Sequence, residues 1–404
     1  MAERTTSMSS TGSRGRGLVA RTAAAAVVTA LAAALSATAA PADTGGLRGS
    51  QWALTALKAE QAWKTSKGAG VTVAVIGSGV DASHPDLTGR VVKGADLGDG
   101  STVDGTHDQG PQDRQGGTHA AGIIAATGRN YQGDGVHGLA PDARVLPLRV
   151  YRNDSPAPTA TAKAVRYAAD HGARVIDVTV GFTKPSDALR SAVEYALGRG
   201  AVIVTGAGDN GRTGDEVTYP AAYPGVVAVA ATDKKGAIWP NSHHGEHVTL
   251  TAPGVDILAT APGGDYWTGS GTQYAASWVA ATAALLRAEH PRWTGDQVVR
   301  KLTGAASGKS SSGQDPRHGF GAVAPAAALA DRTAPSPTPS ASAVPAADPT
   351  ADARDSIADR PENPAAYVTL LAVGAGLIVL AAIAWFLIRR SASPFNPFDP
   401  SGDD

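Results

Sequence analysis

The central part of the sequence alternates short, strongly apolar runs with longer amphipathic stretches. The apolar runs have the length of strands and are rich in Val, Ile and Ala; they fall at 71–76, 145–150, 175–180, 202–205 and 226–231. The stretches with helical periodicity fall at 160–170, 186–199 and 275–290. Continuous apolar strands separated by helices are typical of a parallel sheet covered on both faces. We therefore predict one α/β domain over residues 47–332, a three-layer fold with a mainly parallel central sheet.

Charge and cysteine content exclude several classes of function. The formal net charge of the chain is -1, so bulk electrostatics does not attract it to nucleic acid. The chain contains no cysteine, which excludes disulfides, thiolate zinc sites and cysteine nucleophiles. We expect no nucleic-acid partner and no cofactor.

The N-terminal segment, residues 1–42, has the features of a secretory signal peptide. Arg14, Arg16 and Arg21 precede an apolar run over 22–35, and small residues that include an Ala-x-Ala pattern follow it. The alternative is a membrane span that stays in place, but the run is short and rich in Ala.

The C-terminal segment predicts a spacer, a membrane span and a short tail. Residues 333–364 are a mixture of Pro, Ala, Ser, Thr and Asp without apolar periodicity, which predicts a disordered linker. Residues 365–388 carry no charge over about 24 residues, enough to cross a bilayer as one helix. Arg389 and Arg390 begin the tail 389–404, and the positive-inside tendency places this tail in the cytoplasm. We expect a single-pass cell-membrane protein whose folded domain is extracellular.

Several segments of the central region resemble, in the same order, the signature blocks of the subtilisin family (peptidase S8). The branch that they resemble most is that of the mycosins, the membrane-anchored subtilisins associated with type VII secretion in actinobacteria. Gln51-Trp52, Ala62-Trp63 and the segment 70–87 carry this resemblance, together with the C-terminal span. The resemblance implies a subtilisin-like fold and a triad in which an Asp orients a His that takes the proton of a nucleophilic Ser.

At each position where the family carries a residue of this triad, the chain has a different residue. Gly77 stands where the family has the Asp, although Asp81, His84, Pro85 and Asp86 follow in family style. Gly116 stands where the family has the His, and Gln273 where it has the nucleophilic Ser. A carboxamide has no ionisable proton, so Gln273 cannot form an acyl-enzyme as a serine does.

The position of the oxyanion-binding Asn is also altered. Asp209 falls at this position, where a carboxylate would repel the developing negative charge. Asn210 is an alternative occupant of the same place. His119 matches the family's second, noncatalytic histidine. It lies three residues further along the chain than the position of the base, which moves its imidazole by several Å, whereas a general base must lie within hydrogen-bond reach. Ser270 and Ser277 lie near Gln273 but not at the nucleophile's position.

Two functional readings follow. The first is a catalytically inactive pseudoprotease that binds a peptide segment or a membrane protein of a secretion complex, because strand addition uses backbone groups and needs no triad. The alternative is a serine-type endopeptidase that uses noncanonical residues. The candidate catalytic residues would then be His119, Asp113, Asp209, Ser270 and the cluster His243, His244 and His247. That cluster also suggests a metal site, but it lies in a polar segment without a second ligand set, which favours a solvated loop.

Overall fold

The computed structural model describes residues 46–110, 116–214, 216–308, 313–331 and 333–335. The predicted signal peptide, the membrane span and the cytoplasmic tail lie outside these residues, as does nearly all of the linker. None of the helices in the described part of the chain combines the length and hydropathy that crossing a bilayer requires.

A seven-stranded sheet forms the centre of the described region, and all of its pairings are parallel. Its strands are β1 (Thr72–Gly77), β2 (Ala95–Asp96), β3 (Arg144–Arg149), β6 (Val175–Val178), β7 (Val202–Gly206), β8 (Val227–Thr232) and β9 (Val248–Pro253). They run in the order β2-β3-β1-β6-β7-β8-β9. The predicted parallel sheet is confirmed, and its inner strands are buried on both faces, as continuous apolar runs require.

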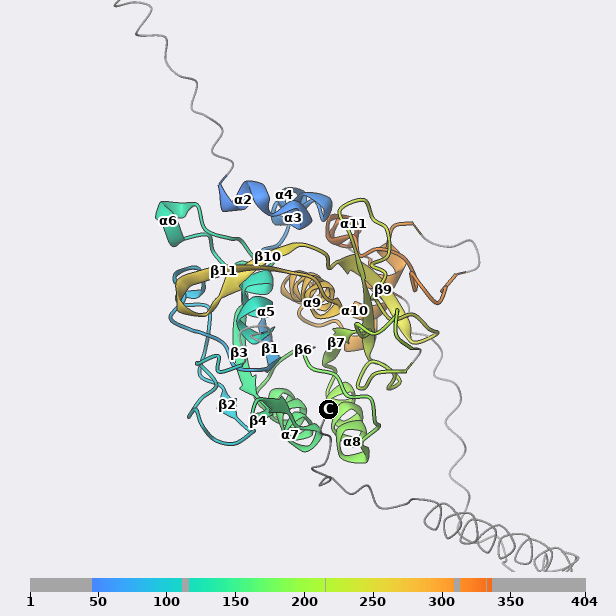
Figure 1. Ribbon diagram of the computed structural model, residues 1–404. Helices are drawn as coiled ribbons and strands as arrows, with labels where there is room; N and C mark the ends of the chain where they lie inside the picture. The colour runs from blue at the N-terminus through green and yellow to red at the C-terminus, as the bar shows by residue number, and fades with distance from the viewer. Residues whose placement is uncertain (1–45, 111–115, 215, 309–312, 332, 336–404) are drawn as a thin grey trace, which may run out of the picture. The chain divides into compact units, whose positions relative to one another are not determined.

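Helices cover both faces of this sheet (Figure 1). On one face lie α5 (Gly116–Ala125), α9 (Thr272–Glu289), α10 (Gly295–Ala305) and α11 (Pro325–Ala330), which share one hydrophobic core with the sheet. On the other face lie α7 (Pro158–Asp170) and α8 (Asp187–Gly198), which form a second core. The helix α9 is buried along almost its whole length, so it lacks the broad exposed polar face of an amphipathic surface helix.

Smaller elements complete the domain. The short N-terminal helices, which pack against the first core, are α2 (Leu47–Ser50), α3 (Trp52–Ala56) and α4 (Ala59–Trp63). Antiparallel pairs are formed by β4 (Tyr151–Arg152) with β5 (Ser155–Pro156), and by β10 (Ile257–Ala261) with β11 (Asp265–Gly269). The remaining helical turns are α6 (Asn130–Gly133), η1 (Pro85–Leu87) and η3 (Pro262–Gly264).

The strand order determines where a site can form. After β1 the chain adds β2 and β3 on one side of it, and then β6 to β9 on the other side. Ligands of open α/β sheets bind in the crevice at the carboxyl ends of the strands, at the point where the strand order changes direction. In this fold that point lies where β1 meets β6.

Candidate functional site

The carboxyl ends of β1, β6 and β7 bring together residues that are far apart in the sequence. Gly77 is the last residue of β1, and Thr179 directly follows β6. Gly206 ends β7, and the first residues of α9 pack against it. A Cβ on Gly206 would lie only 2.4 Å from Thr272 Oγ1, so the absence of a side chain at Gly206 is what permits the N-terminus of α9 to approach the strand.

The positions of Gly77 and Gly116 converge on one hydroxyl group. An ideal Cβ at Gly77 would lie 2.4 Å from Thr179 Oγ1, and one at Gly116 would lie 3.6 Å from the same atom. The Thr179 hydroxyl donates a hydrogen bond of 3.0 Å to the carbonyl of Ile76. The threonine side chain therefore occupies the space into which a side chain at Gly77 would project, whereas the contact at Gly116 is an ordinary one.

Gln273 lies in the first turn of α9 and is half-buried. Its carboxamide folds back over the backbone of Gly271, where a Cβ would meet Gln273 Oε1. The three predicted triad positions are thus placed around one cleft. Two of them are glycines, whose side chain is a hydrogen atom, and the third carries a carboxamide. None of these groups supplies an ionisable proton or a base.

Asp209 lies beside Gln273 and is bonded to the first residue of α9. Its Oδ1 accepts hydrogen bonds from Thr272 N at 2.9 Å and from Thr272 Oγ1 at 2.8 Å. Enclosure of this side of the carboxylate raises the pKa of Asp209, and the two bonds from Thr272 oppose the increase. The Asp209 residue as a whole is exposed, and contact with solvent favours the charged form of its carboxylate.

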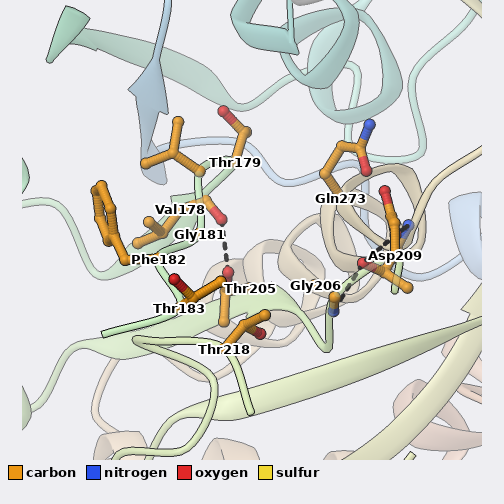
Figure 2. Close-up of a pocket in the computed structure, with 13 residues that line it drawn as sticks. Val178, Thr179, Gly181, Phe182, Thr183, Thr205, Gly206, Asp209, Thr218 and Gln273 are labelled. Atoms are coloured by element: carbon orange, nitrogen blue, oxygen red, sulfur yellow. Dashed lines mark hydrogen bonds between the residues drawn. The ribbon is translucent and has the colours of Figure 1, made fainter. Parts of the chain in front are cut away.

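A cavity of about 220 Å³ opens at these residues. Figure 2 shows Gln273 and Asp209 on one side of it, with Thr179, Val178 and Phe182 on the opposite side. The described residues that line the cavity are 178–183, Thr205, Gly206, Gly208, Asp209, Thr218, Thr272 and Gln273. This volume is below the roughly 300–1,000 Å³ of pockets that hold drug-sized ligands, and it suits a single side chain.

His119 lies in the interior, away from solvent. It is buried, its ring is stacked on that of Trp267, and its Nδ1 lies 3.2 Å from Tyr274 Oη. Burial lowers the pKa of His119 to about 4, so the imidazole is neutral at physiological pH. A general base works best with a pKa near the operating pH, and this ring is also committed to two aromatic neighbours.

The sequence analysis did not identify Asp108, whose carboxylate lies near the first turn of α5. Asp108 Oδ2 accepts hydrogen bonds from Thr118 N at 3.0 Å and from Thr118 Oγ1 at 2.7 Å. Ser78, the neighbour of Gly77, also bonds to this carboxylate, and its Oγ accepts a hydrogen bond from Gly117 N. Burial raises the pKa of Asp108. Asp108 lies in a loop without periodicity, so no sequence signal pointed to its contact with the helix.

The other candidate residues have structural partners. Ser277 is buried and donates to Asp177 Oδ2 at 2.7 Å, while Ser270 Oγ accepts a bond from Asp256 N at 3.0 Å. Asn210 does not take the place of Asp209, because its Nδ2 donates to the carbonyl of Glu216. Asp113 lies outside the described residues.

The histidine cluster contributes no metal centre to the site. His243 and His247 have ring centroids 5.2 Å apart, and His243 is buried rather than solvated as a loop residue would be. The expectation of a solvated loop is therefore wrong for His243. Among the residues that the structure describes, no three His, Cys, Asp or Glu side chains are grouped so that they could hold a metal ion.

The residues after Gly77 that follow the family pattern fasten β11 to the rest of the domain. His84 Nδ1 accepts a bond from Asp86 N, and its Nε2 lies 3.0 Å from the carbonyl of Asp265. The Asp86 carboxylate accepts bonds from Tyr266 Oη and from the backbone N–H groups of Asn130 and Val136. These contacts are architectural, because they hold β11 against the segment that follows β1.

Known proteins resemble this chain in sequence and in structure. Thermitase of Thermoactinomyces vulgaris is 40% identical over 235 residues, which are 58% of this chain and 80% of thermitase. The thermophilic serine proteinase of Bacillus sp. (strain AK1) is 40% identical over 257 residues, which are 61% of either protein. The chain thus spans less than two thirds of the second relative.

Solved mycosin structures superpose on the same region. MycP1 from Mycobacterium smegmatis has a TM-score of 0.60 at 30% identity and covers 69% of this chain and 84% of its own. A structure described as the serine protease MycP1, an essential component of the type VII (ESX-1) secretion system, has a TM-score of 0.62 at 30% identity and covers 72% of this chain and 90% of its own.

The family model of the subtilases, Peptidase S8, matches residues 68–322, which include every strand of the parallel sheet and the cavity at its carboxyl edge. The match extends over more than half of the chain. On this match and on the fold, the chain belongs to the subtilase family.

Proposed function

We propose that this subtilase is a pseudoprotease: a membrane-anchored, extracytoplasmic module that binds an extended peptide segment without cleaving it. Gln273 is the observation that carries the proposal. It occupies the first turn of α9 at the mouth of the cavity, where the family has its nucleophile, and a carboxamide cannot be activated by proton removal.

The other altered positions act in the same direction. In subtilisin, loss of the Ser or of the His alone lowers turnover by about 10⁶-fold, and loss of one oxyanion-hole donor lowers it by about 10²- to 10³-fold. Here glycine replaces the His and the Asp, and the Asp209 carboxylate replaces a donor. We therefore expect the turnover of peptide-bond hydrolysis to be close to undetectable.

The setting that we propose is the outer face of a cell membrane. The predicted signal peptide and the predicted span at 365–388 support it, and so does the likeness to MycP1, which is described as a component of a type VII secretion system. The partner would then be a peptide segment of a secreted protein or a membrane protein of such a system. Co-purification of tagged full-length chain with the membrane proteins of a type VII system tests this setting, and recovery of the chain alone argues against it.

The alternative, hydrolysis by noncanonical residues, has no specific observation in its favour. Two of the residues that it could use have other partners: His119 is packed against Trp267 and Tyr274, and Ser270 Oγ accepts a hydrogen bond from the backbone of Asp256. Asp209 has no described hydroxyl partner other than Thr272.

A fluorophosphonate probe, which labels activated serines, tests the proposal on the full-length chain in a non-ionic detergent, together with casein digestion. The comparison protein carries Gly77→Asp, Gly116→His, Gln273→Ser and Asp209→Asn. A second comparison protein adds Thr179→Ala, because the Thr179 hydroxyl occupies the space next to Gly77.

We expect the natural chain to stay unlabelled and the protein with Thr179→Ala to label most strongly. Labelling and casein cleavage by the natural chain would refute the proposal. The labelled residue would then identify the relocated nucleophile.

A further inference from the structure

Resting on the proposed peptide-binding function, we infer that the cavity at the carboxyl ends of β6 and β7 selects a long cationic side chain, Lys or Arg, of the bound segment. The inference concerns which peptide is held, not whether one is held. Two independent features of the cavity wall support it.

The first feature is charge. Among the described residues that line the cavity, Asp209 is the one with an ionisable side chain, and the others are Gly, Thr, Val, Phe and Gln. Thr272 holds Oδ1 of this carboxylate in place through two hydrogen bonds. Oδ2 accepts no hydrogen bond from the described residues, so a charged acceptor remains available to a ligand. Its position is fixed before the ligand arrives, which reduces the entropic cost of binding.

The second feature is the state of the threonine hydroxyls. Each hydroxyl has one hydrogen to donate and two lone pairs to accept with. Four of the five wall threonines already donate that hydrogen within the protein: Thr179 to Ile76 O, Thr205 to Val178 O, Thr218 to Ala207 O and Thr272 to Asp209 Oδ1. These hydroxyls can offer a ligand only lone pairs.

A wall that combines one carboxylate with committed hydroxyls is rich in acceptors and poor in side-chain donors. Among the described residues of the wall, the Gln273 carboxamide and the Thr183 hydroxyl are the side-chain groups that can still donate as well as accept. An acidic side chain would meet repulsion from Asp209, and an apolar side chain would leave the acceptors unpaired. A Lys ammonium brings three donors and an Arg guanidinium five, each with a positive charge, and their apolar stems match Val178, Val180 and Phe182.

Fluorescence anisotropy on the full-length chain in a non-ionic detergent tests the inference. The probes are fluorescein-labelled, C-terminally amidated hexapeptides Ala-Ala-Ala-X-Ala-Ala, in which X is Lys, Arg, norleucine or Glu. Norleucine has the length of the lysine stem without its charge. The variant is Asp209→Asn, whose carboxamide oxygen can still accept the bonds from Thr272. The matched control is Asp187→Asn, which removes the same charge from a side chain that is 98% exposed on α8.

We expect the Lys and Arg peptides to bind about fivefold more tightly than the norleucine peptide, as one partly exposed charge pair provides, and the Glu peptide to bind most weakly. Asp209→Asn should abolish the preference for Lys and Arg while leaving the affinity for norleucine, which reports an intact cavity. Asp187→Asn should change neither.

Peptide binding without a preference for Lys and Arg, or a preference that survives Asp209→Asn, would overturn the inference and leave the proposed function standing. If the folded chain binds none of the four peptides, the proposed peptide-binding function fails, and the inference fails with it.

Discussion

Asp177 gives the most quantitative test of the described structure, through the substitution Asp177→Asn. The residue lies in the middle of β6, between Val75 of β1 and Val204 of β7, and it is completely buried. One carboxylate oxygen accepts a hydrogen bond from Ser277, and the other has no partner among the described residues. Burial therefore raises the pKa of Asp177 to about 7 from a usual value of 3.8.

The direction of the pH dependence follows from proton binding. Between about pH 4 and pH 7 the folded chain keeps the Asp177 proton while the unfolded chain has lost it, so the free energy of unfolding falls as the pH rises through this window. Above the folded-state pKa both states are ionised, and this contribution becomes constant. A difference of about 3 pKa units corresponds to about 4 kcal/mol at most.

Asp177→Asn should remove this dependence, because the carboxamide stays neutral and can still accept the bond from Ser277. The change in unfolding free energy on substitution should therefore be about 4 kcal/mol more favourable near pH 8 than near pH 4, which amounts to roughly 8–16 °C in the thermal midpoint. Any pH-independent cost of the new amide cancels in this difference.

The assay is thermal unfolding followed by near-ultraviolet circular dichroism across this pH range. Asp187→Asn serves as the control, because the Asp187 side chain is 98% exposed. Parallel stability profiles for the natural chain and Asp177→Asn would refute the reasoning, because they would mean that Asp177 is not desolvated in the folded state.

Four further predictions concern the cleft and its support. Gly77→Ala should destabilise the fold by about 1–3 kcal/mol through contact with Thr179 Oγ1, and Thr179→Ala should relieve that cost in a double-mutant cycle of unfolding free energies; additive effects would contradict the contact. The His119 imidazole should show no protonation by NMR between about pH 5 and pH 8, since its pKa is about 4; a titration near pH 6.5 would mean that it is solvated. Gln273→Ser alone should not react with a fluorophosphonate, because glycine at 116 provides no base; labelling would reveal a base elsewhere. Arg149→Met should lower the unfolding free energy by about 3–5 kcal/mol, because it leaves the buried Asp96 carboxylate without its cation, and an unchanged thermal midpoint would argue against that ion pair.

The sheet was predicted from local apolar patterns. The same patterns did not predict the β10–β11 hairpin or the first residues of α9. The apolar runs located β1, β3, β6, β7 and β8 to within a residue or two, because strands buried on both faces must be continuously apolar. The hairpin of β10 and β11 has a partly exposed second strand and gave no such signal. Helix α9 begins three residues before its predicted start, at Thr272, because Asp209 from another segment bonds to its first N–H group.

The class of fold and the chemical groups that the chain offers follow from the amino-acid sequence alone. The resemblance of its motifs to those of the subtilisin family identified Gly77, Gly116, Gln273 and Asp209 as the positions to examine. Three facts required the folded structure: Gly77 and Gly116 face the Thr179 hydroxyl, Asp108 bonds to the first turn of α5, and Asp177 is buried with one oxygen that has no partner among the described residues. These facts depend on which strand ends are neighbours in the sheet, and the periodicity of a sequence records the burial of each residue but not the partner that buries it.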